Sequence, residues 1–235
     1  MPPAAVGTGD ALVSVVLGCV IVAVAPMGFL HVAGSTAVHP LSATISDYAG
    51  VPGGYALLGI SAVALAVAGC VLAVGLSRAG LPRPALPAAL LGTWSAAMLL
   101  VAVFPTNAPG TPPDLAAAVH RYAGGWVFAA LPLAGWLVAR RAREAQAWSA
   151  TSRGLDRLSL VAGGLSLTFL LSHVPIVVLG SPGFPLLGLV ERVLYGVVIV
   201  LLLAAARATR PAADRARGPA HPPVAPALPD PGGPA

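Results

Sequence analysis

The chain has little charge. Acidic and basic residues together make up 9% of its 235 residues, and lysine is absent, so all thirteen basic residues are arginine. Soluble domains usually carry about a quarter charged residues, which cover their surface in water. A chain with 57% hydrophobic residues and so few charges cannot face water all round. We therefore expect its apolar surface to face lipid.

Other shortages argue against further classes of protein. Only two cysteines occur, Cys19 and Cys70, and both lie in apolar stretches, so neither a disulfide framework nor a Cys-rich metal site is indicated. Walker, dinucleotide-binding and HExxH motifs are missing. The net charge of +5 does not indicate a nucleic-acid partner, because the arginines lie at the ends of apolar runs. We expect no nucleic acid and assign no cofactor.

The long apolar runs are the strongest signal in the sequence. A transmembrane helix needs about 20 mostly apolar residues, and these runs lack the alternation of barrel strands. The sequence therefore predicts an all-α fold, a polytopic bundle of six transmembrane helices within residues 1–206. Small residues such as Gly69, Gly92 and Gly124 are expected to let helices approach closely. The predicted spans are 11–30, 55–76, 86–104, 122–138, 158–179 and 186–206.

The arginines predict the orientation of this bundle. Cytoplasmic loops carry the excess of basic residues, and eleven arginines follow spans two, four and six, whereas only Arg121 and Arg192 lie on the other side. We therefore expect a multi-pass protein of the cell inner membrane with both termini in the cytoplasm. Residues 207–235 are rich in Pro, Ala and Arg, and this composition predicts a disordered cytoplasmic tail.

Titratable residues gather on the predicted outer side. Glu191 and Arg192 lie inside span six, where charges usually face a bundle interior or a wet cavity. Tyr195 shares the helix face of Glu191, four residues on. A structural alternative is an ion pair between Glu191 and an arginine that locks helices together. Asp114 is expected to cap the helix of span four. The other candidates on this side are His31, Asp47, Tyr48, Asn107, His120, Tyr122, Trp126 and His173.

Three short stretches carry a resemblance to a known family. They are HPLSATISDYAG at residues 39–50, VFPTNAPG at 103–110 followed by His120, and GLVERVLYG at 188–196. With these stretches the chain resembles a bacterial six-span membrane family catalogued as domain of unknown function 998. The resemblance implies the six-helix fold and a bacterial inner membrane, and it supplies no activity. The family pattern has Asp after FPT, where this chain has Asn107.

These residues leave three functional hypotheses open. In the first, an outward-facing polar pocket binds or handles a lipid or small amphiphile. In the second, an intramembrane enzyme acts on a lipid or isoprenoid, with Glu191, Asp47 and His120 in acid–base roles. In the third, His120 and His173 hold a metal or haem. Residues expected to contact the ligand or substrate are Tyr48, Asn107, Tyr122, Trp126, His173, Arg192 and Tyr195.

Overall fold

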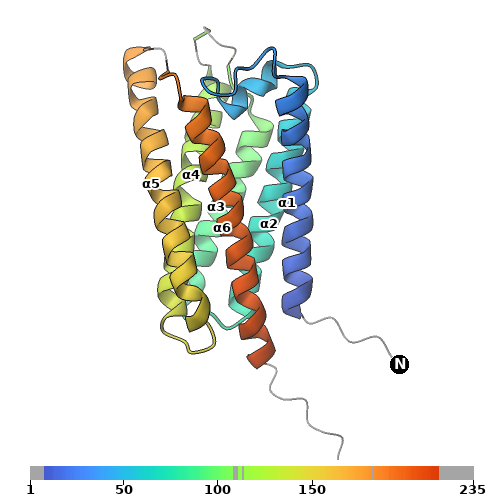
Figure 1. The fold of residues 1–235 in the computed structure, drawn as a ribbon, viewed down its shortest axis with the longest axis vertical. Coiled ribbons are helices and arrows are strands. Elements are labelled where there is room, and N and C mark those ends of the chain that lie inside the picture. The colour runs from blue at the N-terminus through green and yellow to red at the C-terminus, as the bar shows by residue number, and fades with distance from the viewer. Residues whose placement is uncertain (1–7, 108–110, 113, 182, 217–235) are drawn as a thin grey trace, which may run out of the picture.

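Long helices make up most of the part of the chain that the structure describes (Figure 1). The computed structural model describes residues 8–107, 111–112, 114–181 and 183–216, and no strand occurs among them. Six of the helices are long and apolar enough to cross a membrane, which confirms the predicted all-α transmembrane bundle. The elements are α1 (Thr8–Ala33), the 3-10 helix η1 (Ile45–Gly50), α2 (Gly54–Arg78), α3 (Ala85–Val103), α4 (Leu115–Ala142), α5 (Ser149–Leu179) and α6 (Leu187–Ala216).

The helices α4, α5 and α6 extend furthest past the predicted spans. α4 begins at Leu115 because the carboxylate of Asp114 accepts a hydrogen bond from the amide of Ala117 at 2.8 Å, as expected for a cap. α5 begins with a polar turn at Ser149. α6 continues to Ala216, and Ala and Arg favour helix there. The start of the predicted disordered tail is therefore helical, and residues 217–235 lie outside the described residues.

Successive helices run in opposite directions and give the bundle two distinct ends. We call the end with η1 and the α1–α2, α3–α4 and α5–α6 connections the loop end. The opposite end, with the α2–α3 and α4–α5 connections, is the arginine end (Figure 1). Asp10 near the start of α1 forms an ion pair with Arg210 of α6, so these two helix ends meet at the arginine end. The assignment of this end to the cytoplasm stays a prediction.

Close packing between the helices depends on a few small residues. A Cβ atom on Gly69 would lie 2.7 Å from the Trp94 ring, and the Trp94 indole, fully buried, donates to the carbonyl of Val127 at 3.0 Å. The expectation of close approach is therefore confirmed at Gly69. It is wrong at Gly92 and Gly124, because a Cβ on either would meet nothing within 4 Å.

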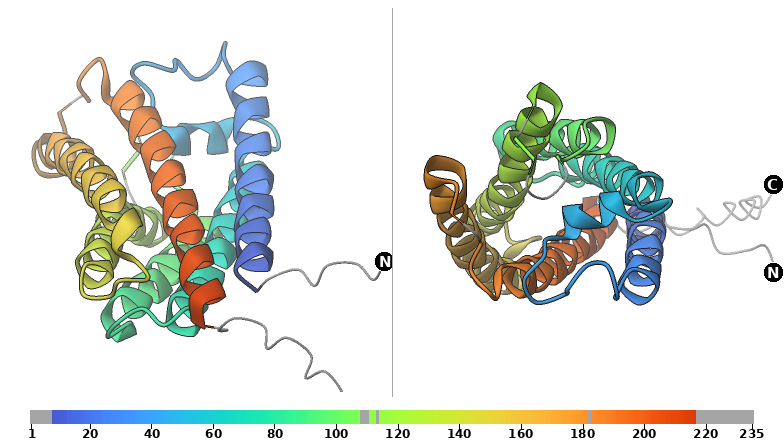
Figure 2. Two further views of the ribbon diagram at one scale, coloured as in Figure 1. Left: turned by 60° about the horizontal axis from the view of Figure 1, so that its bottom comes forward. Right: turned by 90° about the horizontal axis from the view of Figure 1, so that it is seen from above.

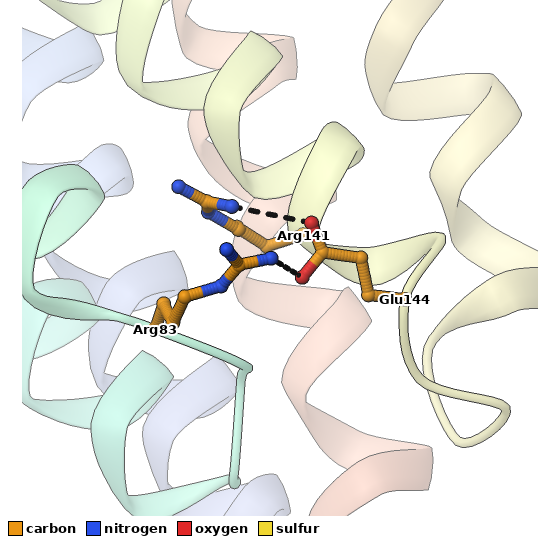
Figure 3. Close-up of polar contacts among 3 residues, drawn as sticks. All are labelled: Arg83, Arg141 and Glu144. Atoms are coloured by element: carbon orange, nitrogen blue, oxygen red, sulfur yellow. Dashed lines mark hydrogen bonds and ion pairs between the residues drawn. The ribbon is translucent and has the colours of Figure 1, made fainter.

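Exposed ion pairs occur at the arginine end. The Glu144 carboxylate pairs with both Arg83 and Arg141, one at each of its oxygens (Figure 3). The Arg141 guanidinium is 3.2 Å from the Glu144 carboxylate, and Arg143 pairs with Asp156 at 3.1 Å. The hydrogen bond from Arg83 is the main reason that the pKa of Glu144 lies below its ordinary value. Exposed pairs of this kind contribute little to stability.

Candidate functional site

The connection between α1 and α2 folds inward over the loop end. Seen from above, η1 lies within the outline of the bundle (Figure 2, right). Thr44 precedes η1, and its amide and hydroxyl both donate to the carboxylate of Asp47, at 2.6 and 2.9 Å. Tyr48 of η1 is fully buried against Leu30 and Val38. This local capping and this buried ring give the loop a defined shape.

The start of α6 fastens this loop to the bundle. One oxygen of the Glu191 carboxylate, Oε2, accepts from the amide of Ile45 at 2.6 Å. The Leu189 amide donates to the carbonyl of Leu41 at 3.0 Å. Gly188 has no room for a side chain, because a Cβ there would collide with the carbonyl of Ala43. The predicted ion pair of Glu191 with an arginine does not form among the described residues; a backbone amide takes its place.

Arg192, the residue after Glu191, also bonds to the loop and in addition to α1. Its Nε donates to Nε2 of His31 at 2.8 Å, and its Nη1 donates to the carbonyls of Ala43 and Gly188 at 2.8 and 2.9 Å. Its guanidinium also lies 5.7 Å from the centre of the Tyr48 ring, within the range of a cation–π contact. Arg192 therefore ties α1, the loop and α6 together.

Beneath the loop lies a cavity of about 840 Å³. Its size falls within the usual range of small-molecule sites, roughly 300–1,000 Å³. Most of its lining is apolar, with Trp94, Met98, Phe128, Phe169 and Val198 among the larger side chains. Its titratable lining residues are Asp47, Tyr55, His120, Arg121, His173, Glu191 and Tyr195, and Asn107 also lines it.

The two histidines of the cavity are held in the same way. Nδ1 of His120 lies 2.7 Å from the carbonyl of Phe104, and Nδ1 of His173 lies 2.8 Å from the carbonyl of Phe169. A carbonyl only accepts, so Nδ1 carries a proton in both rings. The Phe169 ring packs against His173 at an angle of 58°, with centroids 4.3 Å apart. Both imidazoles therefore have a fixed orientation and tautomer.

Four predicted ligand-contact residues do not line the cavity. Tyr48 and Arg192 belong to the fastening of the loop. Tyr122 is 75% exposed on α4, and Trp126, also exposed, donates to Thr93 Oγ1 at 3.2 Å. Those two share one face of α4, four residues apart, and the cavity lies against another face, which carries Gly124, Val127 and Phe128.

Sequence reasoning missed several lining residues. Arg121 follows His120 directly, and Phe169 precedes His173 by one helical turn. The second spacing was a usable signal, because residues four apart share a helix face. Trp94 and Phe128 gave no signal, since apolar residues on every face are usual in a membrane helix. Among the described residues, no group of three or more His, Cys, Asp or Glu side chains is arranged to hold a metal ion.

Comparison with known families supports the resemblance noted in the sequence. The profile of the family described as "Protein of unknown function (DUF998)" matches residues 14–208. The chain belongs to this family. No curated protein and no solved structure matches it.

The three stretches that suggested membership in this family meet at the loop end. Residues 39–50 contact the 188–196 stretch through the Ile45 amide and Glu191, and through Ala43 and Arg192. In the second stretch, the carbonyl of Phe104 contacts His120, and Pro105, Thr106 and Asn107 line the same cavity as residues of the other two stretches. Segments far apart in the chain thus form one structural unit, which consists of the loop, the start of α6 that bonds to it, and the walls of the cavity beneath.

Proposed function

We propose that this membrane protein binds a lipid or small amphiphile in the cavity beneath the η1 loop. The observation that carries the proposal is the cavity itself, about 840 Å³, with polar side chains from η1, α4, α5 and α6 set among a mostly apolar lining. An amphiphile matches this division, because its chain is favoured on apolar walls and its head group on polar ones.

The position of α5 supports entry from the bilayer. α5 packs more closely on α4 than on α6, and its loop-end half stands away from α6 in Figures 1 and 2. Ile176 and Val177 of α5 and Leu187 of α6 line the cavity on this side. A membrane-dissolved ligand would reach the cavity between these two helices without crossing the loop.

Binding accounts for the polar groups better than catalysis does. Acid–base chemistry needs a donor and an acceptor within hydrogen-bond reach of the reacting group. Glu191, Asp47 and His120 each use one atom to bond to the backbone, and no hydrogen bond among the described residues joins any two of them into an acid–base pair. Their bonds hold the cavity walls in place, which is the requirement for a binding site.

The test is to fill the cavity. Gly124 lines it, and a Cβ on Gly124 meets nothing within 4 Å, so Gly124→Leu places a side chain into open space. Gly92→Leu is the matched control: Gly92 is also helical and has the same free space, but it is exposed and does not line the cavity. Protein purified from membranes would be analysed by native mass spectrometry for retained lipid.

The expected result is a retained amphiphile in wild type and Gly92→Leu, with at least about tenfold less in Gly124→Leu, since an occupied cavity excludes the ligand. Equal retention in all three proteins, each folded by size-exclusion chromatography, would refute the proposal.

A further inference from the structure

Several polar atoms that remain free in the cavity are hydrogen-bond acceptors. In both His120 and His173, Nδ1 is the donor to a backbone carbonyl. In a neutral imidazole with its proton on Nδ1, Nε2 carries a lone pair and accepts. No described residue donates to either Nε2, so each ring offers one acceptor.

His31 shows the same arrangement with its acceptor occupied. Its Nδ1 lies 2.8 Å from the carbonyl of Met27, and its Nε2 accepts from Arg192 Nε. An imidazole that accepts at Nε2 is neutral, with its proton on Nδ1. His31, which does not line the cavity, thus uses a protein donor where His120 and His173 have none.

Glu191 and Tyr195 of α6 also present polar atoms at the cavity that have no partner in the described part of the chain. The Glu191 carboxylate uses Oε2 for the Ile45 amide, and no described residue donates to Oε1. Tyr195 lies one turn further along α6, and its buried hydroxyl has no hydrogen-bond partner among the described residues. Among the described residues, Arg121 is the single arginine that lines the cavity, whereas two carboxylates line it, those of Asp47 and Glu191.

We infer that the ligand is an amphiphile whose head group donates hydrogen bonds, through hydroxyl or ammonium groups, rather than an anionic lipid. Such a head group satisfies Nε2 of His120, Nε2 of His173 and Oε1 of Glu191. An anionic head group without hydroxyl or ammonium groups brings no donor to these acceptors, and among the described residues it meets two carboxylates and only one arginine. This inference rests on the proposed function, because it concerns the ligand of the same cavity.

Three probes with the same twelve-carbon chain test it: dodecylamine, the glycerol monoester of dodecanoic acid, and dodecanoate. Each is titrated at the same fixed pH and at equal mole fraction in detergent micelles, and occupancy is read by native mass spectrometry. The amine and the glycerol ester are expected to bind at least about tenfold more tightly than dodecanoate, since hydrogen bonds with charged or buried partners are worth that factor.

A variant of His173 tests whether its Nε2 atom causes the preference for head groups that donate hydrogen bonds. His173→Phe keeps a ring against Phe169 but removes Nε2, so the amine and the ester should weaken by about fivefold while dodecanoate is unchanged. His39→Phe is the control, because His39 is exposed in the loop and does not line the cavity; it should leave all three affinities unchanged.

The outcomes separate the two proposals. If Gly124→Leu abolishes binding but dodecanoate binds as well as the other probes, or better, the head-group inference is overturned and the binding function stands. If Gly124→Leu binds all three probes as wild type does, the cavity is not the site and both proposals fail. Loss of the preference in His173→Phe and not in His39→Phe supports the inference.

Discussion

The two ends of the bundle use charged residues in opposite ways. At the arginine end, Glu144 lies between two arginines at the surface, and its side chain is 37% exposed. At the loop end, Glu191 is 7% exposed and bonds to a backbone amide 146 residues away in the chain. The ion pairs of Glu144 are exposed to solvent and contribute little to stability. The hydrogen bond of Glu191 fixes the position of a loop, and with it the roof of a cavity.

This difference predicts where substitutions are costly. An exposed ion pair contributes roughly 0–1 kcal/mol, whereas a buried amide left without its acceptor costs about 1–3 kcal/mol. Changes at the loop end should therefore affect both stability and ligand binding, and the same changes at the arginine end should affect neither by much.

The largest effect is expected from Gly188→Ala. The added Cβ collides with the carbonyl of Ala43, so the loop must move, at a cost of about 3 kcal/mol. Gly196→Ala is the control on the same helix, where a Cβ meets nothing within 4 Å; it should raise stability by up to ~1 kcal/mol. Thermal unfolding in detergent compares the two variants. Equal stability of the two would show that α6 does not hold the loop.

Glu191→Leu should come next, with a loss of about 2 kcal/mol, because the buried Ile45 amide loses its acceptor. Glu191→Gln retains an amide oxygen as acceptor and should keep most of the stability. Glu144→Leu, the same change at the arginine end, should lower stability far less, because its ion pairs are exposed. Hydrogen exchange at residues 41–50 should accelerate in Glu191→Leu alone. Unchanged exchange there would contradict the assigned role of Glu191.

Arg83→Gln tests the arginine end through its pH dependence. It removes the main cause of the lowered pKa of Glu144. A lowered pKa in the folded state contributes stability above the ordinary value of 4.5 and loses it as the pH falls below that value. The small difference in melting temperature between wild type and Arg83→Gln should therefore shrink below about pH 4.5. A difference that grows on acidification would contradict this pairing.

The smallest effect is expected from Asn107→Asp, which replaces the side-chain amide by a carboxylate. Asn107 is half-buried, and its side-chain amide donates at 2.7 Å to the carbonyl of Thr111, which is exposed. Aspartate cannot donate there, but water replaces the bond, so stability should change by less than ~0.5 kcal/mol. Melting temperatures measured side by side check this, and a large loss would give the turn a structural role that its exposure does not predict.

Much of this architecture could be predicted from residues near one another in the chain. The apolar runs predicted six helices, and Asp114 predicted the start of α4. Polarity at one predicted end was enough to select His120, His173, Glu191 and Tyr195, all of which line the cavity. Whether these residues bind a ligand stays a proposal.

What could not be predicted depends on contacts between distant segments. The partners of Arg192 include His31, 161 residues away, and no spacing rule connects them. Tyr122 and Trp126 were selected because they lie near the loop end, but the distance along a helix does not say which face meets the interior. The relation of α4 to its neighbours decides that, and it exists only in the folded bundle.

The most direct test of the account is an experimental map of the protein in nanodiscs made with its native membrane lipids. The account predicts an elongated density in the cavity, with its wider, polar end next to His120 and His173 and its chain directed along Phe169 toward the gap between α5 and α6. A map in which Glu191 still bonds to Ile45 while the cavity is empty or filled by protein side chains would contradict the proposal that this cavity binds an amphiphile.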